Sequence, residues 1–155
     1  MDDLFLRVAR ATLLQDPVRL CLAPPGFLHI HLAHKIAAGF PSPASDYMEP
    51  GLDLNEYLVP NKAASFLFTV TGESMAGAGI MDGDKVVVDR SVAPVHGKIV
   101  IGVVNGEYIL KRLFHFNGRL ELRSENSAYA PIRMVEGCEL EIWGVVVGVV
   151  RRYRG

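Results

Sequence analysis

The chain has 155 residues and a formal net charge of −1, with 50% hydrophobic and 21% charged residues. This balance is typical of a folded globular domain and excludes an intrinsically disordered chain. Without a long basic run, strong direct binding to nucleic acid is not expected, and the longest apolar run, residues 142–150, is shorter than the roughly 20 residues of a transmembrane helix.

The N-terminal part is expected to be a short, partly helical arm. Apolar residues near helical spacing within residues 1–16 predict one helix, which Pro17 ends. The histidines that follow fit no common zinc spacing, so we interpret them as surface or interface residues and expect no metal and no cofactor. They are His29, His31 and His34. Because a helix-turn-helix domain needs about 60 residues, fewer than 40 residues ahead of Ala38 argue against a DNA-reading domain.

The rest of the chain is dominated by strand patterns. A capping-box spacing that starts at Asp53 predicts one short helix to Leu58, ended by Pro60. After it come runs rich in β-branched and aromatic residues, bounded by Gly, Pro, Asn or Ser. The expected strands are residues 66–70, 85–89, 99–104, 107–114, 119–123 and 140–150. Many short strands with little helix imply a compact, strongly bent β-fold.

A glycine-rich turn between the first two strands contains a candidate nucleophile. The glycines at positions 72, 77, 79 and 83 allow the backbone to turn sharply and to approach other segments closely. Ser74 lies near the start of this turn, shortly after the strand over residues 66–70. A serine that tight backbone holds at a strand end is well placed to act as a nucleophile, provided that a base is near.

Lys111 is the candidate base. It follows a hairpin turn predicted by Asn105-Gly106, a pair typical of type I′ turns. Alternation places Lys111 on one strand face with Ile109 and Leu113, so we expect its amine to be partly desolvated and its pKa to be lowered. A neutral amine can take a proton from a serine hydroxyl. The alternative is that Lys111 pairs with a carboxylate and that the serine only caps a turn.

The chain ends and the cysteines carry less specific signals. Near the C-terminal end, Arg151, Arg152 and Arg154 are expected to form a solvated basic tail. Cys21 and Cys138 are far apart and have no metal-type spacing, so we interpret them as free thiols of a reducing compartment. The N-terminal residues lack the pattern of a secretion signal, and we expect a cytoplasmic protein without a membrane anchor.

Several short motifs follow one another along the central part of the chain. They are Gly72-Glu73-Ser74-Met75, Asp82-Gly83-Asp84, Val86-Val87-Val88-Asp89, His96-Gly97-Lys98-Ile99-Val100 and Lys111. In order and spacing they resemble the serine–lysine peptidase domain of the LexA and UmuD superfamily, over roughly residues 37–150. Two further tracts, residues 38–47 and 126–132, are similar to UmuD-type SOS mutagenesis proteins.

The resemblance implies a mainly β fold with a defined division of the chain. The expected architecture is a compact, curved, barrel-like β-domain of the LexA and signal peptidase type, preceded by the short, partly helical arm. Residues 1–38 would form the arm that self-cleavage removes. Residues 39–155 would form the β-rich serine–lysine peptidase domain.

The resemblance also assigns roles to individual residues. The cleaved bond would be Ala38–Gly39, because the family cuts itself at Ala-Gly or Cys-Gly ahead of a similar tract. A plain linker is the alternative reading of this stretch. Ser74 would be the nucleophile and Lys111 the base, and the backbone N–H groups of Glu73 and Ser74 would bind the oxyanion.

A role in the SOS response to DNA damage follows from the same resemblance. A RecA–single-stranded-DNA filament would stimulate the self-cleavage. The processed form would then serve as an accessory subunit of an UmuC-type error-prone DNA polymerase, in synthesis past damaged template. The family further implies a homodimer.

Other classes of protein fit the sequence less well. An α/β-hydrolase elbow would need a second glycine after Ser74, at position 76, where the chain has alanine. A signal-peptidase-like enzyme shares the serine–lysine pair but normally has a membrane anchor. A fragment of a LexA-like transcriptional regulator and a catalytically silent binding module remain as alternatives.

Overall fold

The computed structural model describes residues 18–19, 52–133 and 139–154. The predicted helix over residues 1–16 and the Ala38–Gly39 bond lie outside the described residues. The same is true of the three histidines of the arm and of both cysteines, so the predictions that concern them stay predictions.

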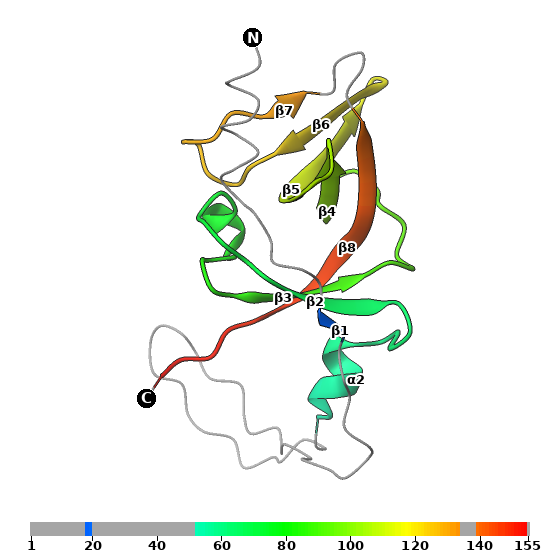
Figure 1. Cartoon of the computed structure of the whole chain (residues 1–155), viewed down its shortest axis with the longest axis vertical. Helices are drawn as coiled ribbons and strands as arrows, with labels where there is room; N and C mark the ends of the chain where they lie inside the picture. Colours follow the sequence, from blue (N-terminus) through cyan, green and yellow to red (C-terminus); the bar gives the residue numbers. More distant parts are fainter. Residues whose placement is uncertain (1–17, 20–51, 134–138, 155) are drawn as a thin grey trace, which may run out of the picture. The chain divides into compact units, whose positions relative to one another are not determined.

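The protein is mainly β, as the sequence predicted, and the described strands form one antiparallel sheet (Figure 1). The strand order in the sheet is β1-β2-β3-β8-β4-β5-β6-β7. The strands are β1 (Val18–Arg19), β2 (Ser65–Thr69), β3 (Lys85–Asp89), β4 (Ile99–Val104), β5 (Glu107–Phe116), β6 (Arg119–Arg123), β7 (Ile132–Arg133) and β8 (Leu140–Val150). All of them belong to one compact unit of the chain, residues 1–20 with 61–155.

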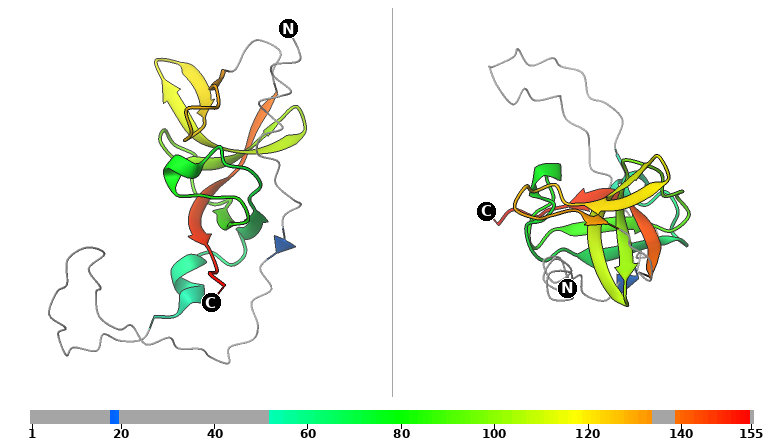
Figure 2. Two further views of the ribbon diagram at one scale, coloured as in Figure 1. Left: turned by 90° about the vertical axis from the view of Figure 1, so that its left-hand side faces the viewer. Right: turned by 90° about the horizontal axis from the view of Figure 1, so that it is seen from above.

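Strand β8 joins two groups of strands that lie on either side of it in the sheet (Figures 1 and 2). Its first half, residues 140–145, pairs with β4, and its second half, residues 145–150, pairs with β3. The register shifts once in each pairing, at Val87/Val88 of β3 and at Ile101/Gly102 of β4. Such bulges bend a strand and increase the local twist. The sheet is therefore curved, and β8 passes through the bend.

The curved sheet buries apolar side chains on both of its faces. One cluster consists of Phe68, Val70, Met75, Ile80, Val86, Val88, Ile101 and Leu110. The other consists of Val100, Val104, Ile109, Leu113, Leu122, Ile132 and Val145. Consecutive residues of β4, Val100 and Ile101, belong to different clusters, and so do Ile109 and Leu110 of β5. Because successive side chains of a strand point to opposite faces, the centre of β4 and β5 is covered on both sides.

The sequence predicted the long strands closely. Strands β3, β4, β6 and β8 have the predicted bounds, β2 is displaced by one residue, and β5 extends beyond its predicted end at Phe114. Strands β1 and β7 were not predicted, because two residues are too few to show a strand period.

The predicted hairpin between β4 and β5 is confirmed. Asn105 and Gly106 have φ values of 49° and 84°, and a type I′ turn requires positive φ at both positions. The turn sets the register in which Val104 pairs with Glu107. A second Asn-Gly pair, residues 117–118, has the same signs of φ and joins β5 to β6.

The described helix, α2 (Leu54–Leu58), belongs to a separate unit of the chain, residues 21–60. The side chain of Asp53 accepts a hydrogen bond from the backbone N–H of Asn55 at 2.7 Å, which satisfies a donor at the helix N-terminus. The helix ends before Pro60, as the sequence predicted.

At the bend of the sheet, position 144 of β8 has room only for glycine, which can be tested by substitution. A methyl group added at Gly144 would lie 2.7 Å from Cγ1 of Val88, whereas one added at Gly102 of β4 would be no closer than 3.4 Å to any atom. We expect Gly144→Ala to lower the free energy of unfolding by about 1–3 kcal/mol, as overpacking does. Gly102→Ala, the matched control, should change it by less than about 1 kcal/mol. Equal effects in urea denaturation would contradict this account of the bend.

Candidate active site

Ser74 lies in the loop between β2 and β3, in a segment that apolar side chains anchor to the core. Met75 and Ile80 are each 1% exposed and belong to the first apolar cluster. Between them the chain forms the 3₁₀ turn η2 (Ala76–Ala78), which ends at Gly79 with a φ of 77°. Glycine adopts this left-handed conformation without strain. The loop therefore holds Ser74 firmly, and the serine itself is fully buried.

Lys111 reaches Ser74 from strand β5. It pairs with Val100 of β4 in the sheet, and only 1% of the lysine is exposed. The two residues just before it on β5, Ile109 and Leu110, are buried as well. The Nζ atom of Lys111 donates a hydrogen bond to Oγ of Ser74 at 2.8 Å. The fold thus brings together an amine and a hydroxyl that lie 37 positions apart in the sequence.

Burial changes the acid–base properties of the lysine. It lowers the pKa of Lys111 from 10.5 to about 8, because the protein interior solvates an ammonium group less well than water does. At pH 7 roughly a tenth of the molecules would then have a neutral amine at this position. A neutral amine 2.8 Å from a hydroxyl can accept its proton, which turns the serine oxygen into a nucleophile.

Glu125 and Asn126, which follow β6 and are called the Glu125 segment below, fix the backbone on both sides of Ser74. The N–H of Glu125 donates to the carbonyl of Ser74 at 2.9 Å, and the N–H of Gly77 donates to the carbonyl of Glu125 at 2.7 Å. The side-chain amide of Asn126 donates to the carbonyl of Glu73 at 3.0 Å. A methyl group at Gly77 would lie 2.3 Å from the Glu125 carbonyl oxygen, so glycine is required for this close approach.

From the sequence, residues 126–132 were used only for the family resemblance, and no contact of Glu125 or Asn126 with the loop was predicted. Its contacts with the loop join residues about 50 positions apart, such as Glu73 and Asn126. A contact of this kind leaves no hydrophobic period and no turn signature in the sequence. The close approach that glycines in the loop permit was predicted, but not the segment that makes the approach.

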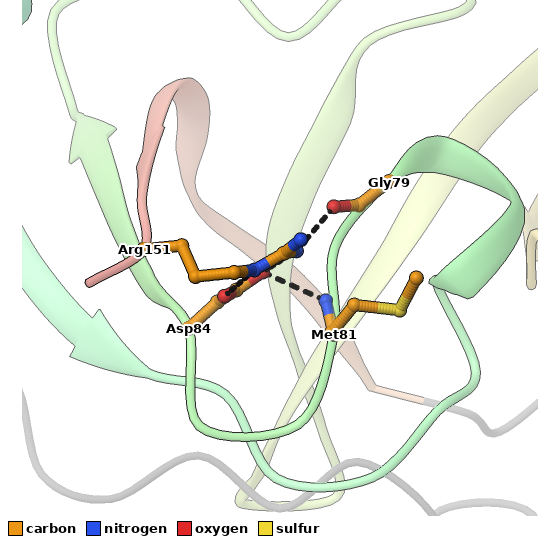
Figure 3. A network of polar contacts seen from close by, with 4 residues as sticks. All are labelled: Gly79, Met81, Asp84 and Arg151. Atoms are coloured by element: carbon orange, nitrogen blue, oxygen red, sulfur yellow. Dashed lines mark hydrogen bonds and ion pairs between the residues drawn. The ribbon is translucent and has the colours of Figure 1, made fainter. Parts of the chain in front are cut away.

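The far end of the loop is held by an ion pair between a buried aspartate and an exposed arginine (Figure 3). Asp84 is 2% exposed and accepts hydrogen bonds from Nε and Nη2 of Arg151, each at 2.6 Å. It also accepts from the N–H of Met81 at 2.8 Å, while Arg151 donates to the carbonyl of Gly79 at 2.8 Å. The hydrogen bond from Arg151 holds the pKa of the Asp84 carboxyl below its usual value. The residue after β8 therefore fastens the loop between β2 and β3.

Arg151 is exposed, as predicted for the basic tail, but its ion pair with Asp84 was not predicted. Its side chain is engaged by Asp84, which lies 67 positions earlier in the sequence, so the local sequence carries no sign of the pairing. Arg152 and Arg154 are exposed, as predicted.

A surface hollow is lined by residues 81–85 and 150–154 and includes neither Ser74 nor Lys111. In the described ranges, no three residues among His, Cys, Asp and Glu gather closely enough to bind a metal ion. No helix in this part of the chain has the length and apolar character needed to cross a membrane.

The structure describes only some of the residues to which the sequence analysis gave roles. Ser74 and Lys111 are in direct contact, and Glu73 precedes the serine in the same loop. The proposed oxyanion donors, the N–H groups of Glu73 and Ser74, therefore belong to the backbone that the Glu125 segment holds. The Ala38–Gly39 bond lies outside the described residues, so its position relative to the serine stays a prediction.

Comparison with known proteins identifies relatives of the chain. The sequence profile of the Peptidase S24-like family matches residues 31–147. The chain is 43% identical over 123 residues to Protein ImpA of Salmonella typhimurium, covering 79% of this chain and 83% of that protein. It is 44% identical over 117 residues to Protein SamA of Salmonella typhimurium strain LT2, covering 76% and 81%. Over 126 residues it is 35% identical to the LexA repressor of Clostridium perfringens, covering 81% of this chain and 61% of the repressor.

The pKa of Lys111 predicts how stability depends on pH. Below pH 8 the lysine is protonated in both the folded and the unfolded chain, so folding carries the full cost of burying the charge. Between pH 8 and 10.5 only the unfolded chain binds the proton, and stability therefore rises with pH. A Lys111→Met variant lacks this pH-dependent contribution to the free energy of unfolding. We therefore expect the difference in free energy of unfolding between the methionine and the lysine form to fall by about 3 kcal/mol from pH 8 to pH 10.5.

Urea denaturation at several pH values measures this difference. Both forms should carry Ser74→Ala, so that the chain stays intact whatever its activity. Lys98→Met is the matched control, because Lys98 is exposed. A stability difference between Lys111→Met and its parent that stays constant from pH 8 to 10.5 would contradict a lowered pKa.

Proposed function

The chain belongs to the Peptidase S24-like family, and we propose that it is a serine peptidase that cuts its own chain with Ser74 as nucleophile and Lys111 as general base. Family membership and the mainly β sheet confirm the resemblance to the LexA and UmuD superfamily and the fold class it implied. The observation that carries the proposal is the hydrogen bond of 2.8 Å between two buried groups, the lysine amine and the serine hydroxyl.

In the first half of the proposed reaction, a peptide bond is broken and an ester is formed. The neutral amine of Lys111 takes the proton from Oγ of Ser74, and the oxygen attacks the carbonyl carbon of Ala38. When the tetrahedral intermediate collapses, the Ala38–Gly39 bond breaks. The ammonium of Lys111 gives its proton to the nitrogen of Gly39, which leaves as a free amine. Ala38 remains joined to Ser74 as an acyl ester.

In the second half, water releases the acyl group. Lys111 is neutral again after it has protonated the leaving amine, so it can take a proton from a water molecule. The resulting hydroxide attacks the ester carbonyl, and the oxygen of Ser74 leaves and recovers a proton from the lysine. The products are residues 1–38 with a new carboxyl group and residues 39–155 with a new amino group.

The tetrahedral intermediate carries a negative oxygen that needs fixed donors. We assign this role to the backbone N–H groups of Glu73 and Ser74. The carbonyl of Glu73 belongs to the same peptide unit as the N–H of Ser74, and Asn126 holds that carbonyl. Because C=O and N–H of a trans peptide point in opposite directions, fixing the carbonyl also fixes the direction of the donor.

The protonation state of Lys111 supports self-cleavage that is slow at neutral pH in the absence of a stimulating partner. With a pKa of about 8, the amine is mostly protonated at neutral pH and cannot act as a base. Anything that excludes water further from the site would favour the neutral form and accelerate cleavage. Stimulation by a RecA–single-stranded-DNA filament, which the family resemblance implies, fits this requirement.

The family resemblance supports the wider role. We assign the processed form, residues 39–155, to the SOS response as an accessory subunit of an UmuC-type error-prone DNA polymerase, acting as a homodimer in the cytoplasm. The similarity to ImpA and SamA over more than 80% of their length supports this assignment over a LexA-like regulator, of which the chain matches 61%. The contact between serine and lysine supports catalysis over a silent binding module.

Self-cleavage can be tested on the purified full-length chain. We expect incubation at about pH 10, or with RecA filaments on single-stranded DNA, to yield two fragments, residues 1–38 and 39–155, that mass spectrometry identifies. Ser74→Ala and Lys111→Ala should abolish both fragments, because each removes one partner of the proton transfer. Ser127→Ala and Lys98→Ala, at exposed positions, should cleave as the parent does. A parent chain that stays whole under both conditions would overturn the proposal.

The rate of self-cleavage should follow the titration of Lys111. Because only the neutral amine acts as a base, we expect the first-order rate constant to rise about tenfold per pH unit below pH 8 and to level off above it. Gel densitometry over time at pH 6 to 10 gives the profile. A rate that does not change between pH 6 and 8 would argue against the lysine as the base.

A further inference from the structure

The two proposed catalytic residues lie on parts of the chain that are not paired with each other in the sheet. Ser74 lies in the loop after β2, and Lys111 lies on β5. Strands β2 and β5 are not neighbours in the sheet, because β3, β8 and β4 lie between them. The main-chain pairing of the sheet therefore does not by itself fix the loop against the lysine.

The loop is fixed instead by the segment after β6, the strand that pairs with β5. Glu125 exchanges two backbone hydrogen bonds with the loop, one with Ser74 at 2.9 Å and one with Gly77 at 2.7 Å. The position of Ser74 therefore follows the position of the Glu125 backbone. Any contact that sets Glu125 relative to β5 also sets the serine relative to the lysine.

Arg112, the residue next to Lys111 on β5, makes such a contact. Its Nε donates to Oε1 of Glu125 at 2.5 Å, and its Nη1 donates to the carbonyl of Gly97 at 2.6 Å. One guanidinium group thus joins the strand of the lysine, the turn before β4 and the segment that holds the serine loop. A lysine has a single donor group and could not make both contacts in the same geometry.

We propose that Arg112 is a positioning residue for the peptidase reaction and acts through Glu125. Its ion pair keeps the loop of Ser74 at the distance from Lys111 that proton transfer requires. The inference rests on the proposed function, since it takes Ser74 and Lys111 as the reacting pair. It assigns to Arg112 no contact with the substrate.

The exposure of the ion pair separates this role from a merely stabilising one. The side chains of Arg112 and Glu125 are each 27% exposed, and ion pairs with such access to water contribute little to stability. Loss of the pair should therefore leave the fold nearly unchanged. Catalysis is more demanding, because an error of about 1 Å between reacting groups can slow a reaction about a hundredfold.

A second arginine offers a matched control. Arg123 pairs with Arg112 across strands β5 and β6, and it forms its own ion pair with Glu121 at 2.8 Å. This ion pair does not include Glu125 or the serine loop. Arg123→Met removes the same charge from the same part of the sheet as Arg112→Met does, without releasing the segment that holds Ser74.

The test compares self-cleavage rates of the full-length chain at pH 10, which is above the pKa of about 8 of Lys111 in the parent chain. We expect Arg112→Met to cleave at least tenfold more slowly than the parent, and Arg123→Met within threefold of it. Melting temperatures of both variants should lie within about 4 °C of the parent. Arg112→Lys should recover only part of the rate, because it keeps the charge and loses the fork of donors.

Two further measurements identify the route through Glu125. Glu125→Gln should slow cleavage in the same direction, because it removes the charge that Arg112 pairs with. The double variant Arg112→Met/Glu125→Gln should be no slower than Arg112→Met alone, since Arg112→Met has already removed this contact. Reaction of Ser74 with a fluorophosphonate probe should slow in parallel, which a defect confined to arm docking would not cause.

The outcomes distinguish this inference from the proposed function. If the parent chain does not cleave itself, the proposed function fails, whatever its reaction with the probe. If the parent cleaves and Arg112→Met cleaves at the parent rate, or no more slowly than Arg123→Met, the positioning role of Arg112 alone is overturned. Should Arg112→Met fail to fold, Arg112→Lys and Glu125→Gln decide in its place, and a parental rate in both would overturn the role.

Discussion

The contact between the buried amine of Lys111 and the buried hydroxyl of Ser74 is the constraint on which the site depends. Keeping an ammonium group in this place at neutral pH costs about 3 kcal/mol, which the surrounding sheet has to offset. The sheet does so by covering both faces of β4 and β5 with apolar clusters. The burial that these clusters provide is therefore also what lowers the pKa of the lysine.

Much of this arrangement could be predicted from local sequence. Strand bounds follow from runs of β-branched residues between turn formers, and the Asn105-Gly106 pair fixed the register of the hairpin that carries Lys111. Alternation along β5 then placed the lysine among apolar neighbours. That Ser74 would meet this lysine came from the order of several motifs resembling a known superfamily, and not from spacing alone. The role of the pair in catalysis remains a proposal.

What the sequence did not reveal are contacts between segments that are distant along the chain. Arg151 is exposed, as expected, but its ion pair with Asp84, which closes the serine loop, was not predicted. The link from Arg112 to Glu125 was likewise not anticipated. The sequence gives the charge of a side chain but does not identify the residue with which it pairs. Its partner is set by the bends of the sheet, which depend on bulges such as that at Val87/Val88, and these have no periodic signature.

The central place of β8 has a consequence for biosynthesis. Residues 140–150 leave the ribosome after β2 to β7, yet β3 and β4 meet only through them. A nascent chain can form the hairpin of β4 and β5 early, but it cannot join the two groups of strands until β8 has emerged. Since contacts so distant along the chain form late in folding, β2 and β3 should join β4 and β5 only after β8 has been synthesised. A chain whose synthesis has not reached β8 therefore keeps the strand before Ser74 and the strand of Lys111 in separate groups of the sheet.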